Sequence, residues 1–299
     1  PTPGSASPAA WECRGRVLDL SRRIHIMGIV NTTPDSFSDG GRLPTVDAAI
    51  DHALRMEQEG VDILDIGGES TRPGAAPVGA EEELARVLPM VHGLAGRTSC
   101  LISVDTRKAY VARACLDAGA HILNDVTALQ GDPEMAALAA ESGAGVVLMH
   151  MRGDPSNMQD APHYNDVELE VGDFLAAAEA AAVHAGVAPG RIVLDPGIGF
   201  GKTLDHNLAL LAASGHLQTR LGRPLLLGLS RKRFIGTLTG RAVGERLPGS
   251  LAALAASAML GVRIFRVHDA KESCDAARIV ERMTIHHIPQ PTQPKSWNI

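Results

Sequence analysis

The chain has 299 residues, which fits either two average domains or one α/β barrel, and 45% of them are hydrophobic, enough for a large buried core. Its longest apolar runs reach only strand or short-helix length, which excludes a transmembrane span. A formal net charge of -6 excludes a general attraction to nucleic acid or anionic lipid, so any anion-binding function must come from local groups of Arg, Lys or backbone N–H.

The two ends of the chain and its cysteines point to no chemistry. Residues 1–16 lack the apolar core of a signal peptide, and their Pro, Ala and Ser content predicts a flexible extension. Residues 287–299 are expected to form a tail, which leaves residues 17–286 for one catalytic domain. The four cysteines are scattered without the spacing of a zinc site, so we expect a reducing, cytoplasmic location.

Short aliphatic runs alternate along the chain with Ala/Leu/Glu-rich segments of helical period, the pattern of strand-then-helix units around a parallel sheet. The predicted strands cover residues 24–31, 62–68, 101–106, 121–126, 145–150, 192–197, 224–230 and 264–269. The predicted helices cover residues 45–59, 80–95, 107–118, 133–142, 167–185, 204–219, 248–260 and 271–285. Because no linker separates these units, the sequence predicts a single α/β domain, a (β/α)8 TIM barrel, with an open Rossmann-like sheet as the alternative.

Polar residues stand where the predicted strands end. They are Asn31, Asp65 with Glu69, Asp105, Asn124 with Asp125, Met149 with His150, Asp195, Ser230, and Arg266 with His268 and Asp269. The C-terminal ends of barrel strands meet at one face, which carries the active site in such barrels. A single Asp, Asn or Ser in this position is as often a helix cap as a ligand. Polar ends on all the strands predict a ligand site.

Several loops after these strands are unusual. Residues 31–42 and 68–79 are long, polar and Gly-rich, which is typical of binding loops, although the same residues suit ordinary turns. The segment DPGIGFGKT, residues 195–203, has Pro196 where a phosphate-binding P-loop needs its first glycine, so a Walker A motif is excluded. Its glycines are expected to let the backbone pass close to a flat ligand.

A basic segment, residues 230–233, follows the seventh predicted strand, where barrels often bind phosphate. Arg231 and Arg233 also fit a solvated basic surface. Lys232 and Arg266 lie nearer the strand ends and are the better candidates for the site.

These segments together resemble the dihydropteroate synthases, a family of pterin-binding barrels in folate biosynthesis, from about Ile24 to Arg282. The matching motifs, in the family's order, are MGIVNTTPDSFSDGG (27–41), DIGGESTRPGA (65–75), SVDTRK (103–108), ILNDVTAL (122–129), LMHMRG (148–153), LDPGIGFGK (194–202), GLSRKRFIG (228–236) and RVHD (266–269). The resemblance implies a transferase that joins p-aminobenzoate to 6-hydroxymethyl-7,8-dihydropterin diphosphate and releases diphosphate.

The resemblance gives roles to the matching positions. The pterin is expected to contact Asp105, Asn124, Asp195, Lys232, Met149 and Phe200. The diphosphate is expected to contact Asn31, Thr71, Arg72, Ser230, Arg266 and His268. The p-aminobenzoate pocket is expected to contain Phe37, Thr71, Arg72, Pro73 and Ser230. The residues expected to carry the catalysis are Lys232, Asp105, Arg266 and His268. Asp65, Glu69 and Asp125 are expected to support the site.

These roles suit the chemistry that the resemblance implies. A carboxylate can accept the paired donors of a pterin edge, while an Asn amide can both donate and accept. Mg²⁺ is expected to bind through Asn31 and phosphate oxygens, because this ion keeps much of its water and commonly relies on substrate phosphates. Diphosphate is expected to leave the pterin methylene before the arylamine adds. That order requires held charges more than a strong base or a nucleophilic side chain.

The resemblance also implies that the two long loops close over the diphosphate, where Asp35 and Arg72 could pair. It implies a homodimer through outer helices, small-molecule substrates without nucleic acid or membrane partners, and inhibition by sulfonamides. Two alternatives stay open. A pterin-dependent methyltransferase shares the barrel but would not need these loops. A catalytically silent paralogue would bind ligand without turnover.

Overall fold

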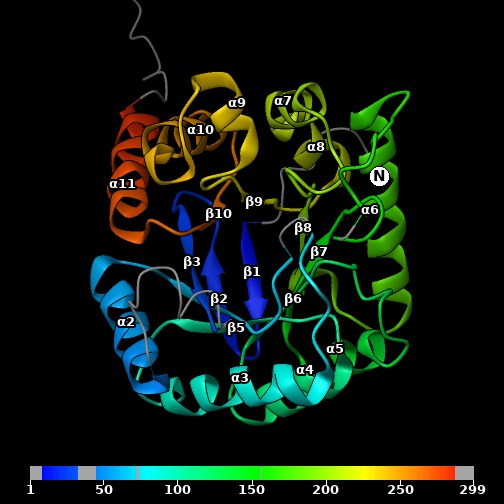
Figure 1. Ribbon diagram of the computed structural model, residues 1–299, viewed down its shortest axis with the longest axis vertical. Coiled ribbons are helices and arrows are strands. Elements are labelled where there is room, and N and C mark those ends of the chain that lie inside the picture. The colour runs from blue at the N-terminus through cyan, green and yellow to red at the C-terminus, as the bar shows by residue number, and fades with distance from the viewer. Residues whose placement is uncertain (1–8, 33–44, 72–73, 156, 287–299) are drawn as a thin grey trace, which may run out of the picture.

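Eight parallel strands lie at the centre of the computed structural model, which describes residues 9–32, 45–71, 74–155 and 157–286 (Figure 1). The strands are β3 (His25–Asn31), β4 (Ile63–Gly67), β5 (Leu101–Asp105), β6 (Ile122–Asp125), β7 (Gly145–Met149), β8 (Ile192–Asp195), β9 (Leu226–Gly228) and β10 (Ile264–Val267). The helices around them are α2 (Val46–Glu59), α3 (Ala80–Leu94), α4 (Ala109–Asp117), α5 (Met135–Ser142), α6 (Val167–His184), α7 (Leu204–Ala212), α8 (Ser214–Leu221), α9 (Arg233–Thr239), α10 (Leu247–Met259) and α11 (Ala270–His286).

The sheet closes into a barrel. Its strands are hydrogen-bonded in the order β8-β7-β6-β5-β4-β3-β10-β9, and a parallel bridge between Leu194 and Leu225 joins the two outer strands. The backbone N–H of Leu194 also donates to the Pro224 carbonyl at 3.1 Å. The prediction of a (β/α)8 barrel is confirmed, and the open-sheet alternative is excluded.

The interior of the barrel is divided into an apolar half and a polar half. Strand register sets Met27 beside Ile63 and Ile63 beside Leu101, and these side chains belong to one buried cluster at the N-terminal ends of the strands. Two residues further along, on the same face of each strand, Asp65 pairs with Ser103. The C-terminal half of the interior is therefore polar.

A hairpin of β1 (Ala10–Cys13) and β2 (Arg16–Asp19) covers the apolar half and crosses the centre of the helix ring in Figure 1. Trp11 and Cys13 are fully buried in the cluster with Met27 and Ile63, and Trp11 Nε1 donates to the Arg191 carbonyl at 2.8 Å. The prediction of a flexible extension over residues 1–16 is thus wrong for the hairpin residues.

The chain turns tightly between these two strands. Arg14 and Gly15 both have positive φ, 48° and 78°, as a two-residue hairpin turn of the primed type requires. The strands next to the turn are only four residues each, so their alternation of buried and exposed side chains is too short to stand out in a Pro- and Ala-rich context.

Two helices differ from the sequence prediction. The helix predicted over residues 204–219 is broken at Ala213 into α7 and α8, next to Ser214 and Gly215, a pair that commonly kinks helices. Helix α9, which begins in the basic segment, was not predicted. Within the described ranges, every helix is too short or too polar to span a bilayer.

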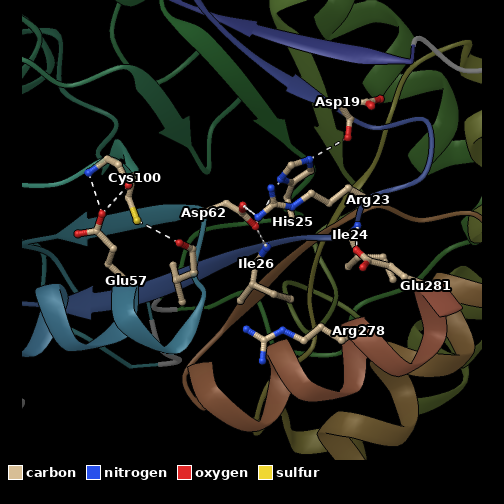
Figure 2. A network of polar contacts seen from close by, with 12 residues as sticks. Asp19, Arg23, Ile24, His25, Ile26, Glu57, Asp62, Cys100, Arg278 and Glu281 are labelled. Carbon is tan, nitrogen blue, oxygen red and sulfur yellow. Dashed lines mark hydrogen bonds and ion pairs between the residues drawn. The ribbon is translucent and has the colours of Figure 1, made fainter.

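A polar network ties the N-terminal ends of the strands together (Figure 2). Asp62, just before β4, accepts from the Ile26 N–H at 3.1 Å and from Arg23 at 2.5 Å. Glu281 of α11 accepts from the Ile24 N–H at 2.6 Å, so the last helix is attached to the first barrel strand. These contacts lie at the end opposite the polar half.

Candidate active site

Arg266 is the central charge of the polar half. Its Nε lies 2.6 Å from Asp65 Oδ2, and its Nη2 lies 2.7 Å from Asp105 Oδ2. Burial alone would lower the pKa of Arg266, but the carboxylates of Asp65 and Asp105 outweigh burial and raise it. Burial raises the pKa of Asp105 to about 7, against the opposing charge of Arg266. The guanidinium is therefore permanently charged, whereas Asp105 can change protonation near neutral pH.

Asn124 is attached to the same group. Its Nδ2 lies 3.3 and 3.4 Å from the two carboxylate oxygens of Asp65, and strand register pairs it with Asp105. Its amide oxygen has no hydrogen-bond partner among the described residues. An acceptor is thus available beside the Asp105 carboxyl.

A second charged pair, Asp195 and Lys232, lies on the β8–β9 side of the barrel. Asp195 Oδ1 accepts from the Gly197 N–H at 2.7 Å, and Lys232 Nζ lies 4.2 Å from the centre of the Phe200 ring. Burial lowers the pKa of Lys232 to about 8, with Asp195 opposing the shift, and burial raises the pKa of Asp195. Each group stabilises the charged form of the other.

The loop that follows Asp195 and carries Phe200 is held by a buried lysine. Lys202 Nζ lies 2.9 Å from His150 Nδ1 and donates to the Phe200 carbonyl at 3.0 Å. Burial lowers the pKa of Lys202 to about 7. At Gly197, where φ is 68°, a Cβ would lie 1.9 Å from the His150 carbonyl, so only glycine fits. The sequence alone assigns Lys202 no role, although this lysine ends the glycine-rich motif LDPGIGFGK, residues 194–202.

Ser230 and His268 form a contact at the ends of β9 and β10. Ser230 Oγ accepts from the His268 N–H and lies 3.2 Å from His268 Nδ1. Burial, together with Arg266, lowers the pKa of His268 to about 3, so the ring is neutral at physiological pH. His268 can therefore offer an N–H to an anion but not a positive charge.

The neighbouring Arg231 is engaged elsewhere. Its Nε lies 3.0 Å from Asp269 Oδ2, and its backbone, at φ 58°, donates from its N–H to Ser250 Oγ at 2.9 Å. Arg246 donates to the Arg231 carbonyl at 3.1 Å. Arg231 and Asp269 thus serve to fix the turn that carries Lys232.

Glu69 holds the base of the 68–79 loop. It accepts from Arg107 at 3.0 Å, from Lys108, and from the Val78 N–H at 3.4 Å near the far end of the loop. Lys108 also pairs with Glu83, whose side chain is fully buried. Thr71, on the same loop, lines a small cavity with Asp105 and Arg107.

Some of the remaining expected residues are described by the structure, and others lie outside the described ranges. Asn31 ends β3 and is half-buried, and Met149 ends β7 in register with Asp195. Asp125 caps its own loop by accepting from the N–H groups of Thr127 and Leu129. Phe37, Arg72 and Pro73, with the expected Asp35–Arg72 pair, lie outside the described residues.

The polar half can bind a flat, polar heterocycle. It offers carboxyl and amide acceptors, two half-buried cations and the Phe200 ring, next to the apolar half of the barrel interior. In the part of the chain that the structure describes, no group of three or more His, Cys, Asp or Glu is arranged to hold a metal ion.

Known proteins are similar to this chain in sequence and in fold. The model of the family described as "Pterin binding enzyme" matches residues 27–268. A dihydropteroate synthase of Escherichia coli K12 is 49% identical over 268 residues, covering 90% of this chain and 94% of its own.

Solved structures agree with that likeness. A Yersinia pestis dihydropteroate synthase in complex with a sulfonamide drug has a TM-score of 0.88 at 47% identity, covering 92% of this chain and 99% of its own. A Xanthomonas albilineans dihydropteroate synthase with 4-aminobenzoic acid has a TM-score of 0.86 at 48% identity, covering 95% of this chain and 100% of its own. The same enzyme with 7,8-dihydropteroate has a TM-score of 0.83 at 45% identity, with 94% and 100% covered.

Proposed function

The chain belongs to the pterin-binding enzyme family that includes the dihydropteroate synthases, and we propose that it condenses 6-hydroxymethyl-7,8-dihydropterin diphosphate with p-aminobenzoate. The products are 7,8-dihydropteroate and diphosphate. The observation that carries this proposal is the polar half of the barrel, where Asp105, Asn124, Asp195 and Lys232 stand around one apolar floor. Related structures hold 4-aminobenzoic acid and 7,8-dihydropteroate, the second reactant and the product of the same reaction.

The pterin would be bound by its polar edge. Asp105 and Asp195 accept from ring donors, and the free amide oxygen of Asn124 adds a third acceptor. Lys232 donates to the ring carbonyl region, while Phe200 and Met149 border the ring. This set supplies both contact area and a fixed orientation.

The diphosphate would lie toward Asn31, Thr71, Ser230, Arg266 and His268. Arg266 brings the permanent charge, and neutral His268 and Ser230 bring N–H and O–H donors. Asn31 offers a neutral oxygen at a half-buried strand end, which fits Mg²⁺ held mainly by phosphate oxygens and water. When bound, Mg²⁺ would neutralise charge on the leaving diphosphate. Arg72, which lies outside the described residues, is also proposed to contact the diphosphate.

The chemistry would proceed by loss of diphosphate from the pterin methylene, followed by addition of the arylamine. Asp105 and Asp195 would hold the ring while it carries positive charge, and Arg266 would hold the departing anion. A preorganised charge of this kind contributes a few kcal/mol to lowering a barrier, on the order of 2.7–4 kcal/mol for one donor. The p-aminobenzoate would enter between Ser230 and the 68–79 loop, a subsite also suited to sulfonamides.

A homodimer through the outer helices is part of the proposal. Exposed apolar side chains lie on α9, α10 and α11 and at the residue after α10: Leu238, Met259, Leu260, Ile279 and Met283. Helices α10 and α11 lie side by side in Figure 1 and in direct contact. We further propose a cytoplasmic location and no nucleic-acid or membrane partner, in keeping with the net charge of -6.

One assay tests the function. The purified chain is mixed with the pterin diphosphate and p-aminobenzoate, with Mg²⁺ or with a chelator, and dihydropteroate is measured. Product that depends on Mg²⁺ is expected. Tight binding of the pterin diphosphate without product under either condition would show that the chain binds this ligand without turning it over.

A further inference from the structure

Asp65 is fully buried in the middle of β4, on the inward face, and it contacts both Arg266, expected to bind the diphosphate, and Asn124, expected to bind the pterin. It accepts from Arg266 Nε at 2.6 Å and from Asn124 Nδ2 at 3.3 Å. We propose that Asp65 is a positioning residue, which fixes the side chains of Arg266 and Asn124 in the orientations that bind the pterin diphosphate. This inference rests on the function proposed above.

The first consequence concerns the guanidinium. A guanidinium has five N–H donors in one plane, so the bond from Nε to Asp65 fixes the direction of the remaining four. One of these lies on Asp105, and the group at Nη1 has no partner among the described residues. Asp65 thus turns the free Nη1 donors toward a ligand instead of leaving the long side chain to sample several rotamers.

The second consequence concerns the amide. An Asn side chain can present either its oxygen or its amino group to a ligand, and only the surrounding bonds decide which. Asp65 is acceptor-only when ionised, so it takes the Nδ2 group of Asn124 and leaves the amide oxygen for the pterin. The acceptor pattern beside Asp105 therefore depends on a residue that need not touch the substrate.

An amide at position 65 would weaken the first constraint and reverse the second while keeping the volume. In Asp65→Asn the neutral Oδ1 can still accept from Arg266, but Nδ2 can donate to Asn124, so the Asn124 amide can turn over and present a donor where the pterin needs an acceptor. We expect the Kd for the pterin diphosphate to rise at least about tenfold, the loss of a hydrogen bond to a charged group. At saturating pterin diphosphate, the KM for p-aminobenzoate should change less than twofold.

The residue just before the same strand provides a matched control. Asp62 also pairs with an arginine and a backbone N–H, namely Arg23 and Ile26 (Figure 2). Asp62→Asn is expected to lower the Tm and to leave the Kd for the pterin diphosphate unchanged. A purely structural role for Asp65 would make the two variants alike, with lower Tm and unchanged Kd.

Titration calorimetry on the full chain, with folding checked by circular dichroism, gives the test. Asp65→Ser serves as a second variant that removes the carboxylate in less volume. The proposal is overturned if either variant binds the pterin diphosphate as the parent chain does, or if neither folds, since Asp65 would then be a folding residue. If the parent chain itself fails to bind the pterin diphosphate while it binds another heterocycle that Asp65→Asn loses, the proposed function falls and the positioning role stands.

Discussion

Arg266 Nη2 lies 2.7 Å from Asp105 Oδ2, so the residue expected to bind the diphosphate is already bonded to one expected to bind the pterin. The two ligand subsites are therefore electrostatically joined before any ligand arrives. Burial raises the pKa of Asp105, and the Arg266 guanidinium opposes that rise. Removing the charge of Arg266 would therefore raise the pKa of Asp105 further.

Lys232→Ala should weaken pterin binding more than it disturbs folding. The variant loses a buried charged donor and its contact with the Phe200 ring, which should raise the Kd for the pterin on the order of 10- to 100-fold. Calorimetry and thermal unfolding measure the two effects. Lys271→Ala on the exposed surface of α11 is the control, and an unaltered Kd in Lys232→Ala would remove Lys232 from the pocket.

Pterin affinity should fall as the pH drops below about 7. The pKa of Asp105 is raised to about 7 by burial, so below that pH its carboxyl gains a proton and loses acceptor capacity. Affinity should then drop about tenfold for each further pH unit until a second group titrates. Calorimetry between about pH 5 and 8 spans the range in which a carboxyl with a raised pKa titrates. Over this range, the pterin affinity of Asp105→Asn should not depend on pH. A slope retained in this variant would assign the titration to another group.

Through Asp105, the stability of the chain should fall as the pH rises, whereas the pterin affinity should rise. Its pKa in the folded state is about 7, compared with 3.8 for an ordinary aspartate, so between these values the folded chain holds a proton that the unfolded chain lacks. The stabilisation from this group is complete below pH 3.8 and is lost as the pH rises through about 7. Urea unfolding at several pH values should show a smaller decline over this window in Asp105→Asn than in the parent chain.

Lys108→Met should destabilise the chain by about 3–5 kcal/mol, because it leaves the fully buried Glu83 carboxylate without its cation. Urea unfolding gives the free energy of unfolding directly. The double variant Lys108→Met with Glu83→Met should recover much of the loss, since an apolar pair of similar volume is often neutral. A single-variant loss below about 1 kcal/mol would show that the Lys108–Glu83 pair contributes little to stability.

Trp11→Ala should cost about 3–5 kcal/mol of stability, since the indole is fully buried beneath the barrel. The kcat of the remaining folded protein should stay unchanged, because the hairpin lies at the end opposite the polar half. Val17→Ala, exposed on the same hairpin, should change stability by less than about 0.5 kcal/mol. Equal effects of the two substitutions would mean that the hairpin does not close the barrel in solution.

The barrel could be predicted because each strand is a short apolar run that ends in polar residues, with a helical segment after it. The hairpin could not, because Trp11 and Cys13 are two apolar residues in a Pro- and Ala-rich context, and only the apolar end of the barrel gives them a place to be buried. Helix α9 is only seven residues long and begins with Arg233, the last residue of the basic segment, so its sequence is too short to indicate a helix.

The gathering of polar side chains at the strand ends could be predicted from residue types, whereas their pairings could not. Arg266 and Asp65 are 201 residues apart, and their contact follows from the strand order β4-β3-β10 and from the inward register. Lys202 stood in a recognised motif, but a lysine is rarely buried, and nothing local indicates that His150 and the Phe200 carbonyl enclose its amine.

The barrel has one weak seam. Among the described residues, β8 and β9 share a single bridge, between Leu194 and Leu225, whereas the other neighbouring strands form continuous ladders. Asp195 and Lys232 stand on the two sides of this seam. A ligand that bonds to both would act as a cross-link between β8 and β9, so occupancy of the site should slow amide hydrogen exchange most along these two strands.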